Sequence, residues 1–207
     1  MPVGLKGNSD GSGAIQIGGS DAISISTGLN TTFAGTITAT GAVAGTTGTL
    51  YPIVSGTAVS ATGTSVDFTG IPSWAKRITV MFSGVSTNGT SGILVQSGSG
   101  SVETSAYTSI NSLTQNAVSP TVTAVTTGFS FTQGQAAADT LFGVLTMSLL
   151  GSNIWTYTSS VNRSGATIQQ QNGTGAKTFS GTIDRIRITT VNGTDTFDAG
   201  TINILYE

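Results

Sequence analysis

The sequence predicts an all-β protein: an extended Gly/Thr-rich N-terminal stalk with short strands, followed by an antiparallel, jelly-roll-like β-sandwich. Three observations support this fold class. Apolar and polar residues alternate with period two in many stretches, which is typical of strands with one buried face. Asn-Gly pairs punctuate these stretches, and they favour tight turns. Helical periodicity is nearly absent, so no helix is available to connect parallel strands.

Residues 1–50 consist mostly of Gly, Ser, Thr and Ala, and they are predicted to form the stalk. The tetrad AIQI at 14–17 recurs as AISI at 22–25, which indicates short alternating strands joined by a glycine turn. Ordering the backbone costs about 1–2 kcal/mol per residue. Each buried large apolar side chain returns about 1.5–3 kcal/mol, and such side chains are sparse here. A single chain is therefore not expected to fold this segment.

Other chains would have to supply the missing contacts if residues 1–50 are ordered. Isoleucines at period two would then point at a symmetry axis or a neighbouring subunit. The candidate contact residues are Ile15, Ile17, Ile23, Ile25, Phe33 and Ile37. The alternative on composition is a flexible Gly/Ser linker or tail.

Residues 51–207 contain all four tyrosines and both tryptophans, and their large apolar residues are denser, so a compact domain is predicted there. About 158 residues suffice for one core. The expected strands span 58–61, 64–69, 77–83, 92–97, 121–132, 140–150, 154–161, 178–191 and 201–206. Hairpin turns are expected at the Asn-Gly pairs 88–89, 172–173 and 192–193. Residues 105–116 could form one short helix, because Tyr107, Ile110 and Leu113 recur at three-residue spacing.

Two strands carry unusual side chains. Residues 141–150 are apolar on both faces, which indicates either the central strand of a sheet or part of a subunit interface. In the stretch 183–188, Asp184 shares the parity of Ile186 and Ile188, so strict alternation would point its carboxylate inward. A bulge before Arg185, or a partner such as Arg77, would resolve this conflict.

The composition excludes several classes of function. The net charge is −2 and the seven Lys and Arg residues are spread along the chain without a basic cluster, so neither nucleic acid nor a membrane surface is an expected partner. The chain has no cysteine and no histidine, which removes disulfides and the usual zinc ligands. Residues 1–13 lack the apolar run of a secretory signal, and no stretch has the ~18 apolar residues of a membrane span. We expect synthesis in the cytoplasm of a cell.

No catalytic residue and no cofactor are predicted. Without histidine, a serine nucleophile would need lysine or a carboxylate as its base, and no Ser-x-x-Lys occurs. Two carboxylates could hydrolyse a glycoside, but most of the nine acidic residues adjoin turns, where aspartate bonds its own backbone. Asp195 and Asp198 are close enough for a calcium loop, yet their spacing misses the EF-hand pattern, and a hairpin loop is preferred.

Aromatic side chains offer the remaining candidate site. Trp74, Trp155 and Tyr157 could stack on sugar rings if they were exposed, although large aromatics in strands are more often core or interface residues. Trp74 follows a stiff corner made by Gly70 and Pro72. We expect Trp74 to be mostly buried and Pro72 to lie outside a strand interior.

Two stretches carry a resemblance to a known family: 67–82 (DFTGIPSWAKRITVMF) and 184–207 (DRIRITTVNGTDTFDAGTINILYE). They resemble C-terminal domains of tailed-bacteriophage fibre and virion-associated proteins, and the likeness covers about residues 51–207. The texture of the N-terminal residues is similar to that of phage fibre shafts. The resemblance implies a virion component, usually a homotrimer, attached to other virion proteins by its N-terminal part, with the sandwich projecting outward. It brings no catalytic residues.

The expected function is therefore that of a non-enzymatic structural protein of a phage particle. Whether it would decorate the capsid as a head fibre or serve the tail in host attachment is left open. The alternative is a module that binds host-surface carbohydrate through Trp74, Trp155 or Tyr157.

Overall fold

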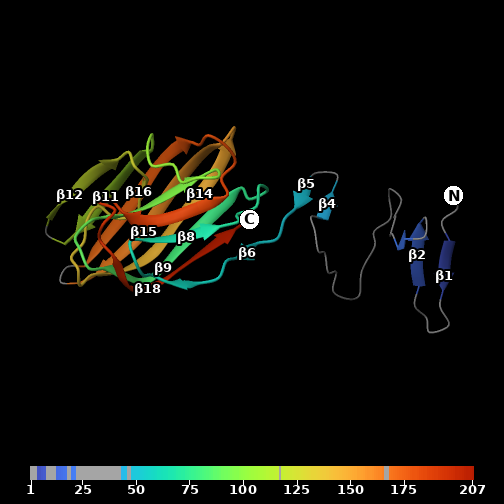
Figure 1. Cartoon of the computed structure of the whole chain (residues 1–207), viewed down its shortest axis with the longest axis horizontal. Helices are drawn as coiled ribbons and strands as arrows, with labels where there is room; N and C mark the ends of the chain where they lie inside the picture. The colour runs from blue at the N-terminus through green and yellow to red at the C-terminus, as the bar shows by residue number, and fades with distance from the viewer. Residues whose placement is uncertain are drawn as a thin grey trace. The chain divides into compact units, whose positions relative to one another are not determined.

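The structure, a computed structural model, describes residues 4–7, 13–17, 20–21, 43–45, 48–116, 118–165 and 168–207. Its contacts divide the chain into two units, Met1–Val43 and Ala44–Glu207. The described part of each unit consists of strands, and within each sheet neighbouring strands pair antiparallel (Figure 1). The predicted all-β class is confirmed. Nothing in these residues is a helix with the length and apolarity needed to cross a membrane.

The first unit contains a three-stranded antiparallel sheet of β1 (Gly4–Gly7), β2 (Gly13–Ile17) and β3 (Ser20–Asp21). Ile15 and Ile17 lie in β2, and the backbone of Ile15 is opposite Leu5. Four other residues predicted to contact a neighbouring chain lie outside the described residues: Ile23, Ile25, Phe33 and Ile37. A two-stranded sheet of β4 (Val43–Gly45) and β5 (Gly48–Leu50) follows.

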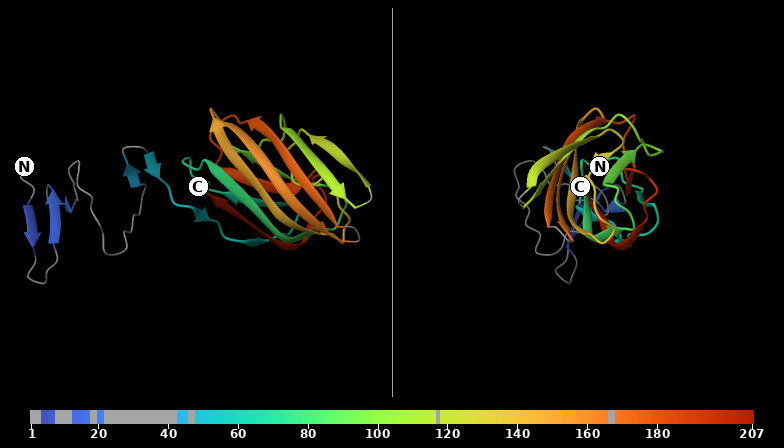
Figure 2. Two further views of the ribbon diagram at one scale, coloured as in Figure 1. Left: turned by 180° about the vertical axis from the view of Figure 1, so that it is seen from behind. Right: turned by 90° about the vertical axis from the view of Figure 1, so that its left-hand side faces the viewer.

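Residues 51–207 form a head in which two antiparallel sheets share one core (Figures 1 and 2). The smaller sheet has four strands in the order β13-β10-β17-β8, and the larger has nine, in the order β12-β11-β16-β15-β14-β9-β18-β6 with β7 also pairing with β18. The bounds are β6 (Val54–Ser55), β7 (Val59–Ser60), β8 (Ser65–Thr69), β9 (Arg77–Thr87), β10 (Ile93–Gly98), β11 (Thr108–Gln115), β12 (Val118–Val125), β13 (Phe129–Ser130), β14 (Thr140–Gly151), β15 (Ile154–Ser164), β16 (Gln169–Thr178), β17 (Arg185–Thr190) and β18 (Phe197–Tyr206).

The core lies between the inner faces of the two sheets. Strand β14, in the middle of the larger sheet, points Leu141, Leu145 and Met147 inward, whereas Phe142 and Val144 are exposed on its other face. Residues 141–150 therefore belong to a central strand. Aromatic rings fill the middle of the core, with Phe82 stacked on Phe131 at 3.8 Å between centroids and Phe129 on Tyr157 at 4.5 Å.

The helix predicted for residues 105–116 is wrong, because residues 108–115 form strand β11. Ser109 and Asn111 are buried, while Thr108 and Ile110 are exposed, so burial follows period two. Strand β11 pairs with β12 on one side and β16 on the other. These backbone hydrogen bonds outweigh the weak helical spacing, and Ser and Thr are poor helix formers in any case.

The Asn-Gly pairs do not make hairpins. Strands β9 and β10 belong to different sheets, as do β17 and β18, so the loops around 88–89 and 192–193 cross from one sheet to the other. Asn88 and Asp195 join these two loops: the Thr196 N–H donates to Asn88 Oδ1 at 2.8 Å, and the Ser91 N–H donates to Asp195 Oδ2 at 2.9 Å. The third pair, 172–173, lies inside β16.

Two predicted strands are each interrupted. Residues 121–132 divide into β12 and β13, which lie in different sheets. In the predicted strand 178–191, β16 ends at Thr178 and β17 begins only at Arg185, so the residues between them form a loop. Asp184 precedes β17, so its carboxylate does not enter the core. It accepts hydrogen bonds from Arg185 at 2.7 and 3.1 Å. The proposed partner Arg77 instead pairs with Glu207.

Candidate interaction surfaces

The corner at residues 70–74 lies at the end of the head where the chain enters from residue 50. Gly70 has a φ of 76°, and Pro72 lies outside the strands, as expected. Trp74 is mostly buried, as expected, because it packs against the core and Tyr51 covers one face of its ring. The two rings stack with centroids 4.9 Å apart and planes 3° apart, and Tyr206 lies 5.7 Å away. We call these three residues the aromatic corner.

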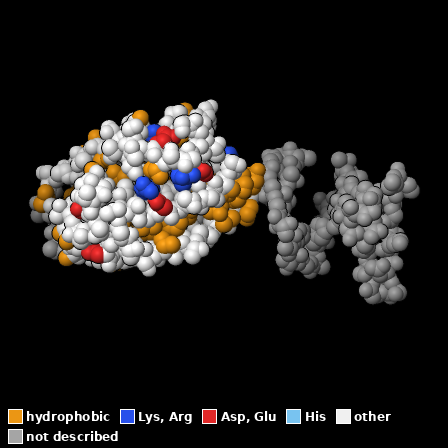
Figure 3. All heavy atoms as spheres, viewed as in Figure 1, with side chains coloured by type: hydrophobic (Ala, Val, Ile, Leu, Met, Phe, Trp, Pro, Cys, Tyr) orange, Lys and Arg blue, Asp and Glu red, His pale blue; other side chains and the backbone are white. Residues whose placement is uncertain are grey.

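Two exposed apolar side chains lie at the same end of the head as the aromatic corner. Ile53 follows Tyr51 and is 65% exposed, and Leu150 is 74% exposed. Leu150 belongs to the same end, because the Leu149 N–H donates to the carbonyl oxygen of Lys76 at 2.8 Å. Figure 3 shows hydrophobic atoms gathered at the end of the head that bears the C-terminus. This end therefore offers an apolar surface beside residue 51.

The other two aromatic candidates cannot stack on a sugar in this fold. Trp155 is 2% exposed and Tyr157 is 1% exposed, because both lie on the inner face of β15 with Val161. The Tyr157 hydroxyl is also fully engaged, lying 2.7 Å from Ser109 Oγ and 3.0 Å from the carbonyl oxygen of Ile110. Their common parity with Val161 was the sequence signal for burial.

Burial raises the pKa of Tyr157 to about 12, and the hydrogen bonds that its hydroxyl makes with Ser109 and with the Ser130 backbone offset part of the increase. The folded state thus holds this proton more tightly than the unfolded state, in which the ordinary pKa is about 10. The stabilisation is fully present below pH 10 and should be lost as the pH rises through 12. Denaturant unfolding measured across this range should show falling stability, and Tyr157→Phe should make the fall shallower. An identical fall in that variant would contradict this assignment.

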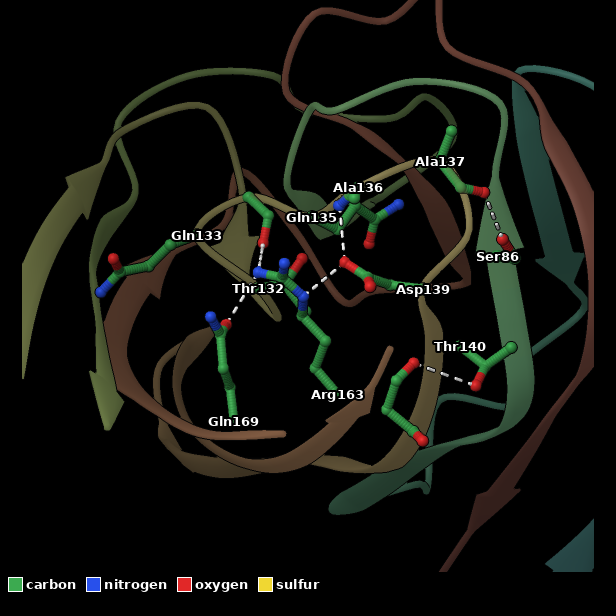
Figure 4. Close-up of polar contacts among 12 residues, drawn as sticks. Ser86, Thr132, Gln133, Gln135, Ala136, Ala137, Asp139, Thr140, Arg163 and Gln169 are labelled. Atoms are coloured by element: carbon green, nitrogen blue, oxygen red, sulfur yellow. Dashed lines mark hydrogen bonds and ion pairs between the residues drawn. The ribbon is translucent and has the colours of Figure 1, made fainter. Parts of the chain in front are cut away.

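A buried polar cluster lies between the loop 131–139 and the larger sheet (Figure 4). Arg163 on β15 points inward, and its Nε atom lies 2.5 Å from Asp139 Oδ2 as an ion pair. The Asp139 side chain is 3% exposed and that of Arg163 is 15% exposed. Arg163 also donates to Gln169 Oε1 at 2.7 Å and to the Gly134 carbonyl at 3.1 Å. Asp139 in turn accepts from the Ala136 N–H at 2.6 Å.

Glutamine and asparagine side chains extend this cluster along the inner face. The Gln133 N–H donates to Gln171 Oε1 at 2.7 Å, and Gln133 Nε2 donates to the Asn111 carbonyl at 2.6 Å. The cluster fastens the loop 131–139 to three strands of the larger sheet. Its carboxylate is already neutralised by Arg163, so the arrangement resembles a structural clamp rather than a catalytic site. Sequence reasoning missed it, because its members come from four separate segments.

The acidic residues considered for a metal site have other roles. Asp195 accepts from Asn192 Nδ2 at 2.6 Å and from the Ser91 N–H, and these bonds hold the pKa of its carboxyl below the ordinary value. Asp198 is exposed on β18. In the part of the chain that the structure describes, no three acidic side chains gather as a metal site would require.

A shallow groove of about 420 Å³ lies on the outer side of the smaller sheet. Its floor includes Leu94 and Gln96, and threonine hydroxyls and Arg187 line the sides. Arg187 donates two hydrogen bonds to the carboxylate of Asp67, each 2.7 Å long. The groove could accept a hydroxylated ligand, but its lining contains no aromatic ring.

Comparisons of the chain with protein-family models, with curated proteins and with solved structures found no match.

Proposed function

We propose that this chain is a non-enzymatic structural protein of a bacteriophage particle. In this proposal residues 1–50 form a trimeric stalk anchored to other virion proteins, and residues 51–207 form an outward, jelly-roll-like head of a short fibre. The resemblance of 67–82 and 184–207 to phage fibre domains supports the assignment. The observation that carries it is the apolar end of the head, where the aromatic corner and Ile53 adjoin the segment that needs other chains to fold.

The side chains favour binding and assembly over catalysis. The chain has no histidine or cysteine. Its most buried carboxylate among the described residues, that of Asp139, is committed to Arg163. Lys177, which is also buried, pairs with Glu103 at 2.9 Å and donates to the carbonyl of Ser105. Such committed charges stabilise a fold, and neither of these two groups is available as a base beside a nucleophile.

The trimer can be tested with single thiols, because the natural chain has no cysteine. Light scattering of the full-length protein should give three times the mass of the chain. Ile53→Cys, treated with a short bis-maleimide, should yield covalent dimers on a denaturing gel, since three entry ends meet near one axis. Val191→Cys is the matched control: Val191 is also exposed, at 47%, but lies beyond β17 of the smaller sheet. It should give only single chains.

A monomeric full-length protein would refute the trimer and with it the fibre. A trimer in which Val191→Cys cross-links and Ile53→Cys does not would refute the placement of the entry end at the axis. Electron microscopy of particles lacking the protein separates the two locations. Missing head projections with retained infectivity would indicate capsid decoration, and lost infectivity with intact heads would indicate a tail fibre.

Host-surface carbohydrate binding is the second candidate, and the groove beside Arg187 and Gln96 favours it. Hydroxyl, amide and guanidinium groups there match the hydrogen-bonding needs of a sugar. Of the three aromatic candidates, only Trp74 keeps an exposed edge, and Tyr51 already covers one of its faces. A glycan array probed with the full-length chain distinguishes this function from a purely structural one.

A further inference from the structure

The outer face of the larger sheet is free of charge across five adjacent strands. The outward side chains of β12, β11, β16, β15 and β14 are Thr, Ser, Asn, Gln, Ala, Val, Ile, Leu and Phe. Two charged residues occur in these strands, Arg163 and Lys177, and both point inward into the head. A surface that faces water on a soluble domain normally mixes charges of both signs.

Hydroxyl groups stand in register across the middle of this face. Thr174 is opposite Thr158, Thr158 is opposite Thr146, and Thr146 is opposite Thr79, so four neighbouring strands contribute one row. Thr79 Oγ1 and Thr146 Oγ1 lie 3.4 Å apart. Because all four residues are threonines, the side chains in this part of the face are short, uncharged and regularly spaced.

Large apolar side chains flank the threonine row. Phe142 is 44% exposed, Val144 is 42% exposed and Ile110 is 45% exposed, and Val122 at the margin is 65% exposed. The outer face of the smaller sheet differs, because it carries Asp67, Arg185 and Arg187. Figure 3 views the head from that side and shows acidic and basic atoms together in its middle, whereas Figure 2 (left) presents the larger sheet. The charged outer face of the smaller sheet therefore suits contact with water, and the uncharged outer face of the larger sheet suits contact with another protein surface.

The larger sheet is also the one joined directly to the N-terminal segment. Strand β6, which begins four residues after β5, pairs with β18 so that Val54 is opposite Tyr206. If the N-terminal segments of several chains assemble, as the proposed function requires, this connection holds the β6–β18 edge of the larger sheet close to the axis of the assembly.

We infer that the charge-free part of the outer face of the larger sheet, from β12 to β14, is the surface through which the heads of neighbouring copies of this chain pack. Two neutral faces bring no like charges together when a symmetry axis repeats them. From strand spacing and rise, five strands of about eight residues cover roughly 630 Å², which lies at the low end of the about 600–1,000 Å² per partner that specific interfaces bury. Sugar sites are concave pockets, whereas this face is a broad sheet surface. The inference rests on the proposed function.

Thiol protection in the assembled full-length protein tests this packing. Thr158→Cys and Asn172→Cys place one thiol each on exposed positions of the face, and Thr69→Cys places one on an exposed position of the smaller sheet. A polyethylene-glycol maleimide should modify the first two at least tenfold more slowly than the third. Circular dichroism and the mass from light scattering establish that each variant is folded and assembled, and two face positions guard against one variant failing to fold.

The outcomes separate the inference from the function beneath it. Equal rates at all three positions in a trimer would overturn the packing and leave the trimeric fibre standing. A monomer with equal rates would overturn both. Slow modification on the face within a trimer supports the packing, and it should disappear when the assembly is dissociated by dilution or mild denaturant.

Discussion

Replacing Arg163 with leucine should lower the free energy of unfolding by about 3–5 kcal/mol, because it leaves the Asp139 carboxylate buried without a countercharge. The same change removes the hydrogen bonds to Gln169 and to the Gly134 carbonyl, so the loop 131–139 loses its attachment to β15. Denaturant unfolding followed by circular dichroism measures the loss.

The matched control is Arg187→Leu. Arg187 pairs with Asp67 in a two-bonded arrangement, but its side chain is 39% exposed and that of Asp67 is 41% exposed. Exposed ion pairs contribute about 0–1 kcal/mol, so this variant should unfold almost as the parent does. Equal losses in the two variants would show that burial of the Asp139 carboxylate is not what makes Arg163 important.

Trp155→Ala should lower the free energy of unfolding by about 3–5 kcal/mol, the range found when a buried aromatic side chain is truncated. Trp155 is among the largest fully buried side chains and lies between Leu149 of β14 and Lys177 of β16 in the sheet register. Its removal opens a cavity that rigid strands on both sides cannot fill. Thermal or denaturant unfolding detects the change.

Trp74→Ala serves as the comparison, since it deletes the same kind of side chain from the aromatic corner, at the edge of the core. A loss of about 1–2 kcal/mol is expected, because part of the ring is already in contact with water. If Trp74→Ala were the more destabilising of the two, Trp74 would be the principal core residue and Trp155 a peripheral one.

Period-two alternation predicted much of the fold correctly. It located β8 and β14 to within about one residue, and it placed Leu141, Leu145 and Met147 on one side of a strand. Those signals are local, because a strand with one buried face alternates apolar and polar residues along its own sequence. The pairing of strands into two sheets depends on contacts between distant residues, and no local pattern records it.

Glycine explains one of the errors. Gly173 was expected to make a turn with Asn172, yet it lies within β16. A side chain there would come within 2.8 Å of Ser130 O and the Tyr157 hydroxyl, so glycine is needed for close packing. The sequence shows that a glycine is present but not whether a turn or a close approach requires it.

The candidate surfaces also contain features that the sequence could predict and features that it could not. Alternation could have assigned Trp155 and Tyr157 to the core, since both share the parity of Val161. The ion pair of Asp139 and Arg163 joins residues from different segments, and only the folded sheet brings them together. The neutral outer face could be read from the sequence only after the register of its strands was known.

Strand β12 has one more consequence. It is the outermost strand of the larger sheet, it is exposed along most of its length, and it contains Pro120. Proline has no N–H to offer an incoming strand, and it interrupts the row of backbone groups that would otherwise template one. Edge-to-edge addition of further molecules at this edge of the sheet is thereby disfavoured. The protein would gain from this protection against fibrous aggregation at high concentration.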